Sequence, residues 1–276
     1  MKITRRSLVS VSIVMMATAL SRAEPTDQPK SPPAAAPAHA SSGNERVDKI
    51  LDRLELKGQA IKGLRCNLVY KYVTVEPVED EQVKEGELLF ARAEPNSRFL
   101  VIFKKIRGGG VERETGEYYG FDGHWLVERN DKAKSITKTE IARPGERTDP
   151  FKIGKGPFPL PFGQKRDDIL QNFRVDLADS TLGDPRNSDH LHCVPIPGTE
   201  LGQKYTRVEI FVDRTLELPV RIVTENVKDG NRIEVDFKDI DASAAPAGSR
   251  FVISEPRDYS VETNPLSDDG GSKRRK

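Results

Sequence analysis

A recurrence of apolar residues at every second position limits what this chain can fold into. It runs through three successive segments near the C-terminal end: Val208, Ile210 and Val212; Leu218, Val220 and Ile222; and Ile233, Val235 and Phe237. A period of two is typical of a β-strand with one buried face and one face in water. Short turns between such strands favour an antiparallel meander, and a sheet of roughly ten strands is expected to curl strongly or to close.

Further segments rich in β-forming residues occupy the first half of the chain. They cover residues 68–75, 85–93, 98–106, 117–121, 124–128 and 134–141. The dipeptide Asp122-Gly123 between two of them is a strong hairpin signal. The segment 98–106 is apolar on both faces, so we expect both to be buried: one toward a cavity and one under a helix, or the reverse.

One helix is predicted ahead of these strands. Val47, Ile50, Leu51 and Leu54 recur at helical spacing after Ser42, which has Glu45 three residues later in the form of a capping box. The helix should end near Gly58 or Gly63. In the centre of the chain, residues 151–162 are rich in aromatics and proline, and 165–173 form a second short helix. This insertion either covers an opening of the sheet or packs on its outside.

The N-terminus has the pattern of an export signal. A basic start is followed by the mostly apolar residues 8–20 and by small residues at a cleavage site after Ala23. The predicted domains are a signal peptide (1–23), a Pro/Ala-rich linker (24–43), one folded domain (44–263) and a polar, basic tail (264–276). The pair Arg5-Arg6 leaves both the general secretory and the twin-arginine routes open.

Composition excludes several classes of function. The chain has 44 Lys and Arg against 43 Asp and Glu, without the basic excess of a general nucleic-acid binder, so no nucleic-acid partner is expected. It contains none of the common hydrolase, metalloprotease or phosphate-loop motifs. We therefore expect no enzymatic activity and no cofactor.

Two groups of residues have metal or redox chemistry. His190 and His192 share one face of a strand, but a third ligand is not evident, so no metal site is predicted. Cys66 and Cys193 are the only cysteines. In an exported protein a disulfide between them is permitted, and the sequence leaves their pairing open.

The order of several short motifs resembles the periplasmic outer-membrane lipoprotein carrier (LolA-like) superfamily. Residues 86–99 and 119–127 resemble its strand pair and its Asp-Gly hairpin, and residues 157–162 and 169–173 fall where the family has a lid. Residues 235–240 and 250–256 resemble its last two strands. The similarity covers roughly residues 45–260.

The resemblance implies a mainly β fold with helices (α+β): a curled, incompletely closed antiparallel β-barrel with helices covering the open side. Its apolar concave face would hold the acyl chains of a lipid or acylated lipoprotein, in a periplasmic and monomeric protein. The candidate residues for this cavity and its lid are Leu88, Phe90, Phe99, Val101, Phe103, Trp125, Phe158, Leu160, Phe162, Ile169 and Leu170. Arg92 is the nearest match to an arginine that holds the family's lid closed.

The same superfamily includes proteins with other roles, because a fold alone does not determine function. The main alternative is an envelope-stress or regulatory sensor that binds a lipid or an inner- or outer-membrane protein. A hydrolase on this scaffold is a third, weaker hypothesis, since no pairing of a nucleophile with a base is evident.

Overall fold

The computed structural model describes residues 40–76, 79–147, 162, 164–243 and 245–266. The chain divides into the units Met1–Ala38 and His39–Lys276, and all elements named below belong to the second. The predicted signal peptide, most of the linker and residues 267–276 of the tail lie outside the described residues. Within the described part, no helix has the length and apolar character needed to cross a membrane.

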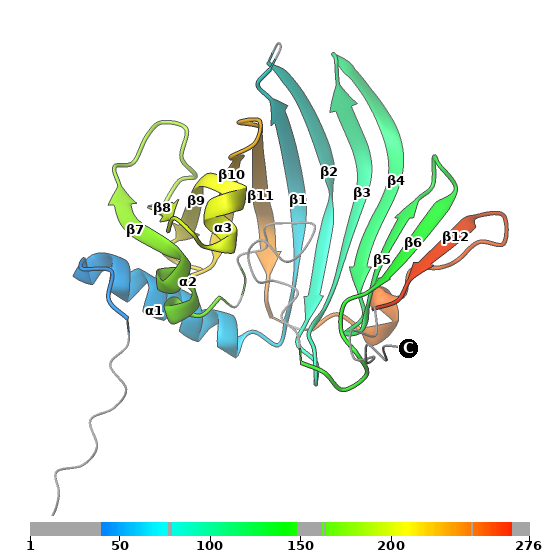
Figure 1. Ribbon diagram of the computed structural model, residues 1–276, viewed down its shortest axis with the longest axis horizontal. Coiled ribbons are helices and arrows are strands. Elements are labelled where there is room, and N and C mark those ends of the chain that lie inside the picture. Colours follow the sequence, from blue (N-terminus) through cyan, green and yellow to red (C-terminus); the bar gives the residue numbers. More distant parts are fainter. Residues whose placement is uncertain (1–39, 77–78, 148–161, 163, 244, 267–276) are drawn as a thin grey trace, which may run out of the picture. The chain divides into compact units, whose positions relative to one another are not determined.

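Among the described residues, twelve strands form one sheet (Figure 1). They are β1 (Gly63–Thr74), β2 (Asp80–Ala91), β3 (Arg98–Gly108), β4 (Val111–Phe121), β5 (Trp125–Asn130), β6 (Ser135–Glu140), β7 (Phe173–Ala178), β8 (Ser188–Pro195), β9 (Tyr205–Asp213), β10 (Pro219–Asn226), β11 (Arg232–Asp241) and β12 (Ser260–Asn264). Their order is β12-β6-β5-β4-β3-β2-β1-β11-β10-β9-β8-β7. Within the described residues, β12 and β7 are the two edge strands of the sheet. They do not pair with each other, so the sheet is not closed. This agrees with the mainly β, open fold expected from the sequence.

The direction of one strand corrects the prediction. Every pairing between the described strands is antiparallel except that of β12, which runs parallel to β6 with Val261 opposite Ile136. Residues 250–256, predicted as a strand, instead begin in a single 3₁₀ turn, η1 (Gly248–Phe251), and contain no strand. Phe251 is buried in this turn, so the apolar residue that indicated a strand is explained by packing without strand pairing.

In the described part of the chain, three α-helices accompany the sheet: α1 (Glu45–Ala60), α2 (Arg166–Asn172) and α3 (Glu200–Lys204). The N-cap of α1 is Asn44, whose side chain accepts hydrogen bonds from the backbone N–H groups of Arg46 and Val47. The predicted capping box, with Ser42 as the cap, is therefore wrong. Asparagine stabilises the unpaired first N–H groups of a helix as well as serine does.

Alternation within each strand separates two faces of the sheet. Leu68 of β1 lies opposite Gly86 of β2 and Phe237 of β11, and all three belong to the same face. Gly86 stands where the register between β2 and β3 shifts. A side chain here would collide with the backbone of Ile102 and Phe103, so only glycine permits this close approach of the two strands.

Each face contributes to a separate apolar cluster. The large one joins α1 (Val47, Ile50, Leu51 and Leu54), Ile169 of α2 and one face of β1–β4 and β7–β11. The small one lies on the opposite face and consists of Leu89, Leu100 and Phe251 with Ile102 and Ile253 against it. The two apolar faces of β3 thus have different partners, the main core with α1 and the segment around η1.

Candidate functional site

The candidate site is the face of the sheet that carries the large cluster, called here the apolar face. From β4 across β3, β2 and β1 to β11 it presents Phe121, Tyr119, Phe99, Val101, Phe103, Leu88, Phe90, Leu64, Cys66, Leu68, Tyr70, Val235 and Phe237. Phe103 meets the rings of Tyr70 and Tyr119 edge-on, with centroids 5.8 and 6.2 Å away. The part of this continuous apolar surface that covers β1–β4, with its edge-to-face aromatic rings, is called here the aromatic layer.

A charged pair lies at one end of this layer. Lys84 of β2 and Glu117 of β4 are 2.6 Å apart, with side chains only 18% and 12% exposed. The Tyr119 hydroxyl donates a hydrogen bond to the same carboxylate at 3.3 Å, and the Lys84 ammonium lies 5.7 Å from the centre of the Phe103 ring. The apolar face therefore ends in a small, largely buried polar cluster.

The tyrosines beside this cluster are neutral donors. Burial raises the pKa of Tyr70 to about 12. Burial, together with the nearby charge of Glu117, raises the pKa of Tyr119 as well. Both hydroxyls keep their protons over the whole physiological range, so they can donate hydrogen bonds to a carbonyl or a carboxylate.

Most of the sequence-predicted lining residues lie on or against the apolar face. Leu88, Phe90, Phe99, Val101 and Phe103 are buried in the large cluster, as are Phe162 and Ile169, while Leu170 is partly buried against it. Phe162 packs edge-on against Phe237, with centroids 4.9 Å apart. Phe158 and Leu160 lie outside the described residues. Contact of any of these with a lipid stays a prediction.

Trp125 lies on the other side of the sheet. It alternates with Leu126, which packs against the large cluster, and lines a pocket with Val127, Phe251 and Ile253. Trp125 and Val127 share a face, as their spacing predicts, but it is the face of the small cluster. Spacing within one strand shows which residues lie together and does not show which side of the sheet they occupy.

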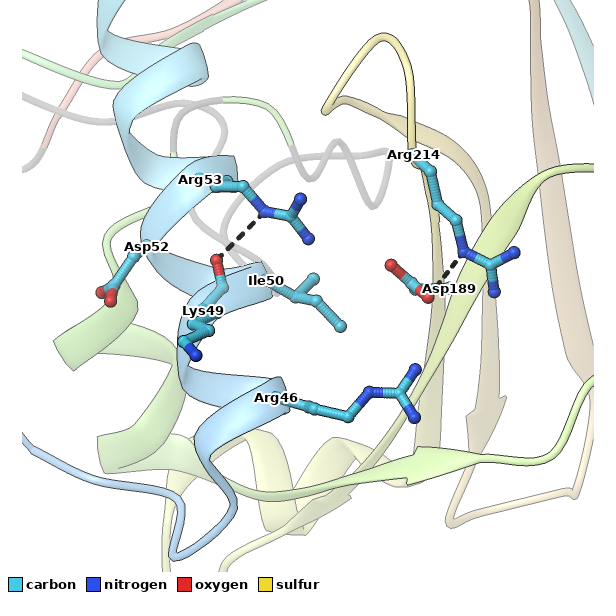
Figure 2. Close-up of a pocket in the computed structure, with 7 residues that line it drawn as sticks. All are labelled: Arg46, Lys49, Ile50, Asp52, Arg53, Asp189 and Arg214. Carbon is cyan, nitrogen blue, oxygen red and sulfur yellow. Dashed lines mark hydrogen bonds and ion pairs between the residues drawn. The ribbon is translucent and has the colours of Figure 1, made fainter.

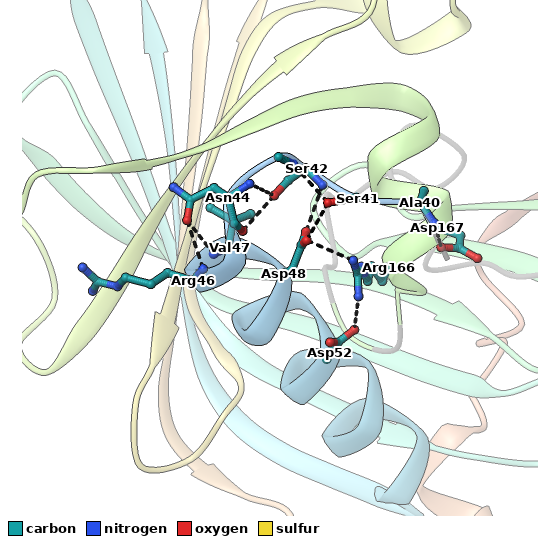
Figure 3. A network of polar contacts seen from close by, with 11 residues as sticks. Ala40, Ser41, Ser42, Asn44, Arg46, Val47, Asp48, Asp52, Arg166 and Asp167 are labelled. Atoms are coloured by element: carbon teal, nitrogen blue, oxygen red, sulfur yellow. Dashed lines mark hydrogen bonds and ion pairs between the residues drawn. The ribbon is translucent and has the colours of Figure 1, made fainter. Parts of the chain in front are cut away.

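A polar network that the sequence analysis missed ties α2 to α1 (Figure 3). The Arg166 guanidinium lies 3.2 Å from Asp48 and 2.7 Å from Asp52, and the Arg166 backbone N–H donates to Glu55 at 2.8 Å. The hydrogen bond to Asp52 contributes most to the raised pKa of Arg166. The only signal in the sequence was the spacing of Asp48, Asp52 and Glu55, which places them on one side of α1.

No protein-family model matches the sequence, and no curated protein is significantly similar to it. Similar solved structures include an uncharacterized conserved protein from Thermus thermophilus, with 11% identity over 80% of this chain and 100% of that one and a TM-score of 0.47. They also include the MucA/MucB complex of Pseudomonas aeruginosa, with 15% identity, 76% and 61% coverage and a TM-score of 0.41.

A LolA superfamily protein from Nitrosomonas europaea is also among them. It has 14% identity over 75% of this chain and 97% of that chain, with a TM-score of 0.36. The family that the sequence motifs resemble is thus represented among the similar solved structures.

Arg92, the predicted lid-holding arginine, contacts the end of α1. Its guanidinium donates to the carbonyl oxygens of Gly58 at 2.7 Å and Ile61 at 3.1 Å. The last carbonyls of a helix lack partners within the helix, and a cation there is favoured by the helix dipole. A gating role stays a prediction, because residues 148–161 of the proposed lid segment lie outside the described residues.

We expect replacement of Arg92 by leucine to lower the free energy of unfolding by about 1 kcal/mol, since the last carbonyls of α1 lose a charged partner. Urea unfolding followed by circular dichroism measures this. Arg107→Leu is the matched control, because Arg107 is exposed and its side chain has no hydrogen-bond or ion-pair partner among the described residues. Equal stability of the two variants would mean that Arg92 does not stabilise α1.

The two cysteines are free thiols in the structure. Both are buried on the apolar face, Cys66 on β1 and Cys193 on β8, and β11, β10 and β9 separate their strands. The disulfide that the sequence permits is therefore not formed here. Burial raises the pKa of Cys66 to about 12 and also raises that of Cys193.

The histidine pair shares one carboxylate. His190 and His192 on β8 both contact Glu209 of the neighbouring β9, at 2.9 and 2.8 Å, and His190 also lies 3.3 Å from Asp184. Among the described residues, no group of His, Cys, Asp and Glu side chains is arranged to hold a metal ion. The cluster is explained as hydrogen bonds and close contacts between the two imidazoles and the carboxylates of Glu209 and Asp184, on the face of the sheet opposite the apolar face.

Proposed function

We propose that this chain is a non-catalytic periplasmic binder or carrier of lipid or lipoprotein acyl chains, which it holds against the apolar face. The observation that supports this most is the aromatic layer over β1–β4 with the Lys84–Glu117 pair at its end. An acyl chain needs a contiguous apolar surface shielded from water, and its polar head needs a few placed hydrogen-bonding groups. The layer and the pair together offer both.

In this proposal the helices cover the open side of a curled sheet. The apolar side chains of α1 and α2 already pack in the same cluster as the apolar face, and Arg166 holds the two helices together. An acyl chain would enter between the aromatic layer and the side chains of Phe162, Ile169 and Leu170, which lie in or against the same cluster. No covalent step is required, so the protein would release the same molecule that it takes up.

The test uses two neighbouring tyrosines of β4 that lie on opposite faces. Tyr119 belongs to the apolar face, whereas Tyr118 lies on the other face under the guanidinium of Arg129, which is 4.5 Å from its ring centre. Trp125 is the only tryptophan, so the Trp125→Phe variant has no tryptophan fluorescence of its own. In it, Tyr119→Trp and the control Tyr118→Trp each place one indole on a known face.

We expect dibromostearic acid to quench the fluorescence of Tyr119→Trp by at least about half at saturation and to leave Tyr118→Trp nearly unchanged, since bromine quenches only an indole that it contacts. Quenching of both, or of Tyr118→Trp alone, would place the fatty acid elsewhere. If neither is quenched and native mass spectrometry shows no bound lipid, the acyl-chain proposal fails. A regulatory role through a protein partner would then be the better hypothesis.

A further inference from the structure

A pocket of about 510 Å³ lies between α1 and the turn that follows β9 (Figure 2). Its lining residues are Arg46, Lys49, Ile50, Asp52, Arg53, Asp189 and Arg214. Arg46 and Arg53 are two helical turns apart and Ile50 lies between them, so the three share one side of α1. Figure 2 shows all three extending from the helix toward Asp189 and Arg214, whereas Asp52 projects from the other side of α1.

The acidic side chains of the lining are already neutralised. Asp189 is buried and accepts a hydrogen bond from Arg214 at 2.8 Å, with its side chain only 8% exposed. Asp52 is paired with Arg166 of α2 at 2.7 Å. Both carboxylates of the lining therefore have a cationic partner, and the positive charge left to the pocket is that of Arg46 and, in part, that of Arg53.

The two arginines of α1 are available to a ligand. The Arg46 guanidinium has no hydrogen-bond or ion-pair partner among the described residues. Arg53 donates to the Lys49 carbonyl at 3.3 Å and lies 3.9 Å from Glu217, with about half of its side chain exposed. Lys49 pairs with Glu45 at 2.6 Å on the solvent side. Arg46 and Arg53 therefore keep most of their donors free and converge on one gap.

We propose that this pocket binds a phosphate ester, with Arg46 and Arg53 as its ligands on α1 and Arg214 on the opposite wall. The planar guanidinium fork suits the oxygens of phosphate and forms charge-assisted hydrogen bonds with them. The source of the phosphate is either a phospholipid head group or a soluble ester. This proposal is independent of acyl-chain binding, because the pocket and the aromatic layer have no lining residue in common.

Titration calorimetry at low ionic strength with glycerol 3-phosphate measures the affinity for the soluble ester. Replacing Arg46 by glutamine should weaken binding about tenfold or more, because one charged donor pair is lost. Arg107→Gln removes the same charge from β3, outside this pocket, and should leave the affinity unchanged. Asp189→Asn should strengthen binding, because it removes the negative charge that faces the ligand and frees the Arg214 guanidinium.

Flotation with phosphatidylcholine vesicles, with and without phosphatidic acid, distinguishes the two sources. Arg46-dependent binding to the phosphatidic acid vesicles, with weak binding of glycerol 3-phosphate, assigns the pocket to a lipid head group. The reverse result assigns it to a soluble ester. The proposal is overturned if the unmodified protein binds neither probe, if Arg46→Gln and Arg107→Gln behave alike, or if a glutamate-rich peptide binds through Arg46 while both phosphate probes do not.

Discussion

Replacing Lys84 by methionine is expected to lower the free energy of unfolding by about 3 kcal/mol. The change leaves the carboxylate of Glu117 without its cation in a site where that side chain is only 12% exposed. Removing one partner of a buried ion pair costs about 3–5 kcal/mol, because the remaining charge has lost both water and its counter-charge. We expect the lower end of this energy range, because Tyr119 and Thr115 still donate hydrogen bonds to the carboxylate of Glu117 and so stabilise its charge.

The control for this prediction is Lys105→Met on the neighbouring strand β3. Lys105 also pairs with a glutamate, Glu112, at 3.3 Å, but both side chains are about half exposed, so its loss should cost less than about 1 kcal/mol. The double variant Lys84→Met/Glu117→Leu should regain most of the lost stability, since no charge stays buried. Denaturant unfolding of the four proteins measures this, and equal stability of the two single variants would show that the Lys84–Glu117 pair is effectively solvated.

The thiols of the native protein are expected to react with iodoacetamide about a thousandfold more slowly than an ordinary cysteine at pH 8. Only the thiolate reacts, and a pKa near 12 for Cys66 leaves roughly one thiol in ten thousand ionised at that pH. Cys193 is fully buried and its pKa is raised as well. Mass spectrometry of the protein alkylated with and without urea counts the modified thiols.

In urea both cysteines should be alkylated at the ordinary rate without any reductant. Failure to react in urea until a reductant is added would show a disulfide and contradict the free thiols of the structure.

The raised pKa values of the two cysteines also predict that the stability of the protein depends on pH with a definite sign. The folded state retains these protons more tightly than the unfolded state, so stability is fully present below about pH 9 and falls as the pH rises toward 12.

Local sequence patterns predicted the elements that carry the apolar face. The alternation in β9–β11, the hairpin at Asp122-Gly123 and the helical spacing of Val47 to Leu54 all correspond to elements of the structure. By contrast, β7, α3 and β12 have no counterpart among the predicted elements. They are short, and β12 is exposed along its whole length, so it lacks the buried alternate residues by which a strand is recognised.

The sequence by itself determined which side chains share a face, because the period of a strand or helix is a property of the local backbone. Leu88 with Phe90, and Phe99 with Phe103, follow from that period alone. The tertiary structure decided which face of each strand joins the main core. Trp125 lies on the face of the sheet that does not carry the aromatic layer, and Leu100 packs on that same face against η1.

The tertiary structure alone also brought together groups that are far apart in the sequence. These include Arg166 with Asp48, Lys84 with Glu117, and Arg46 with Arg214. The physical reason is that strand order and helix docking depend on burial summed over distant segments, and no single segment carries that information.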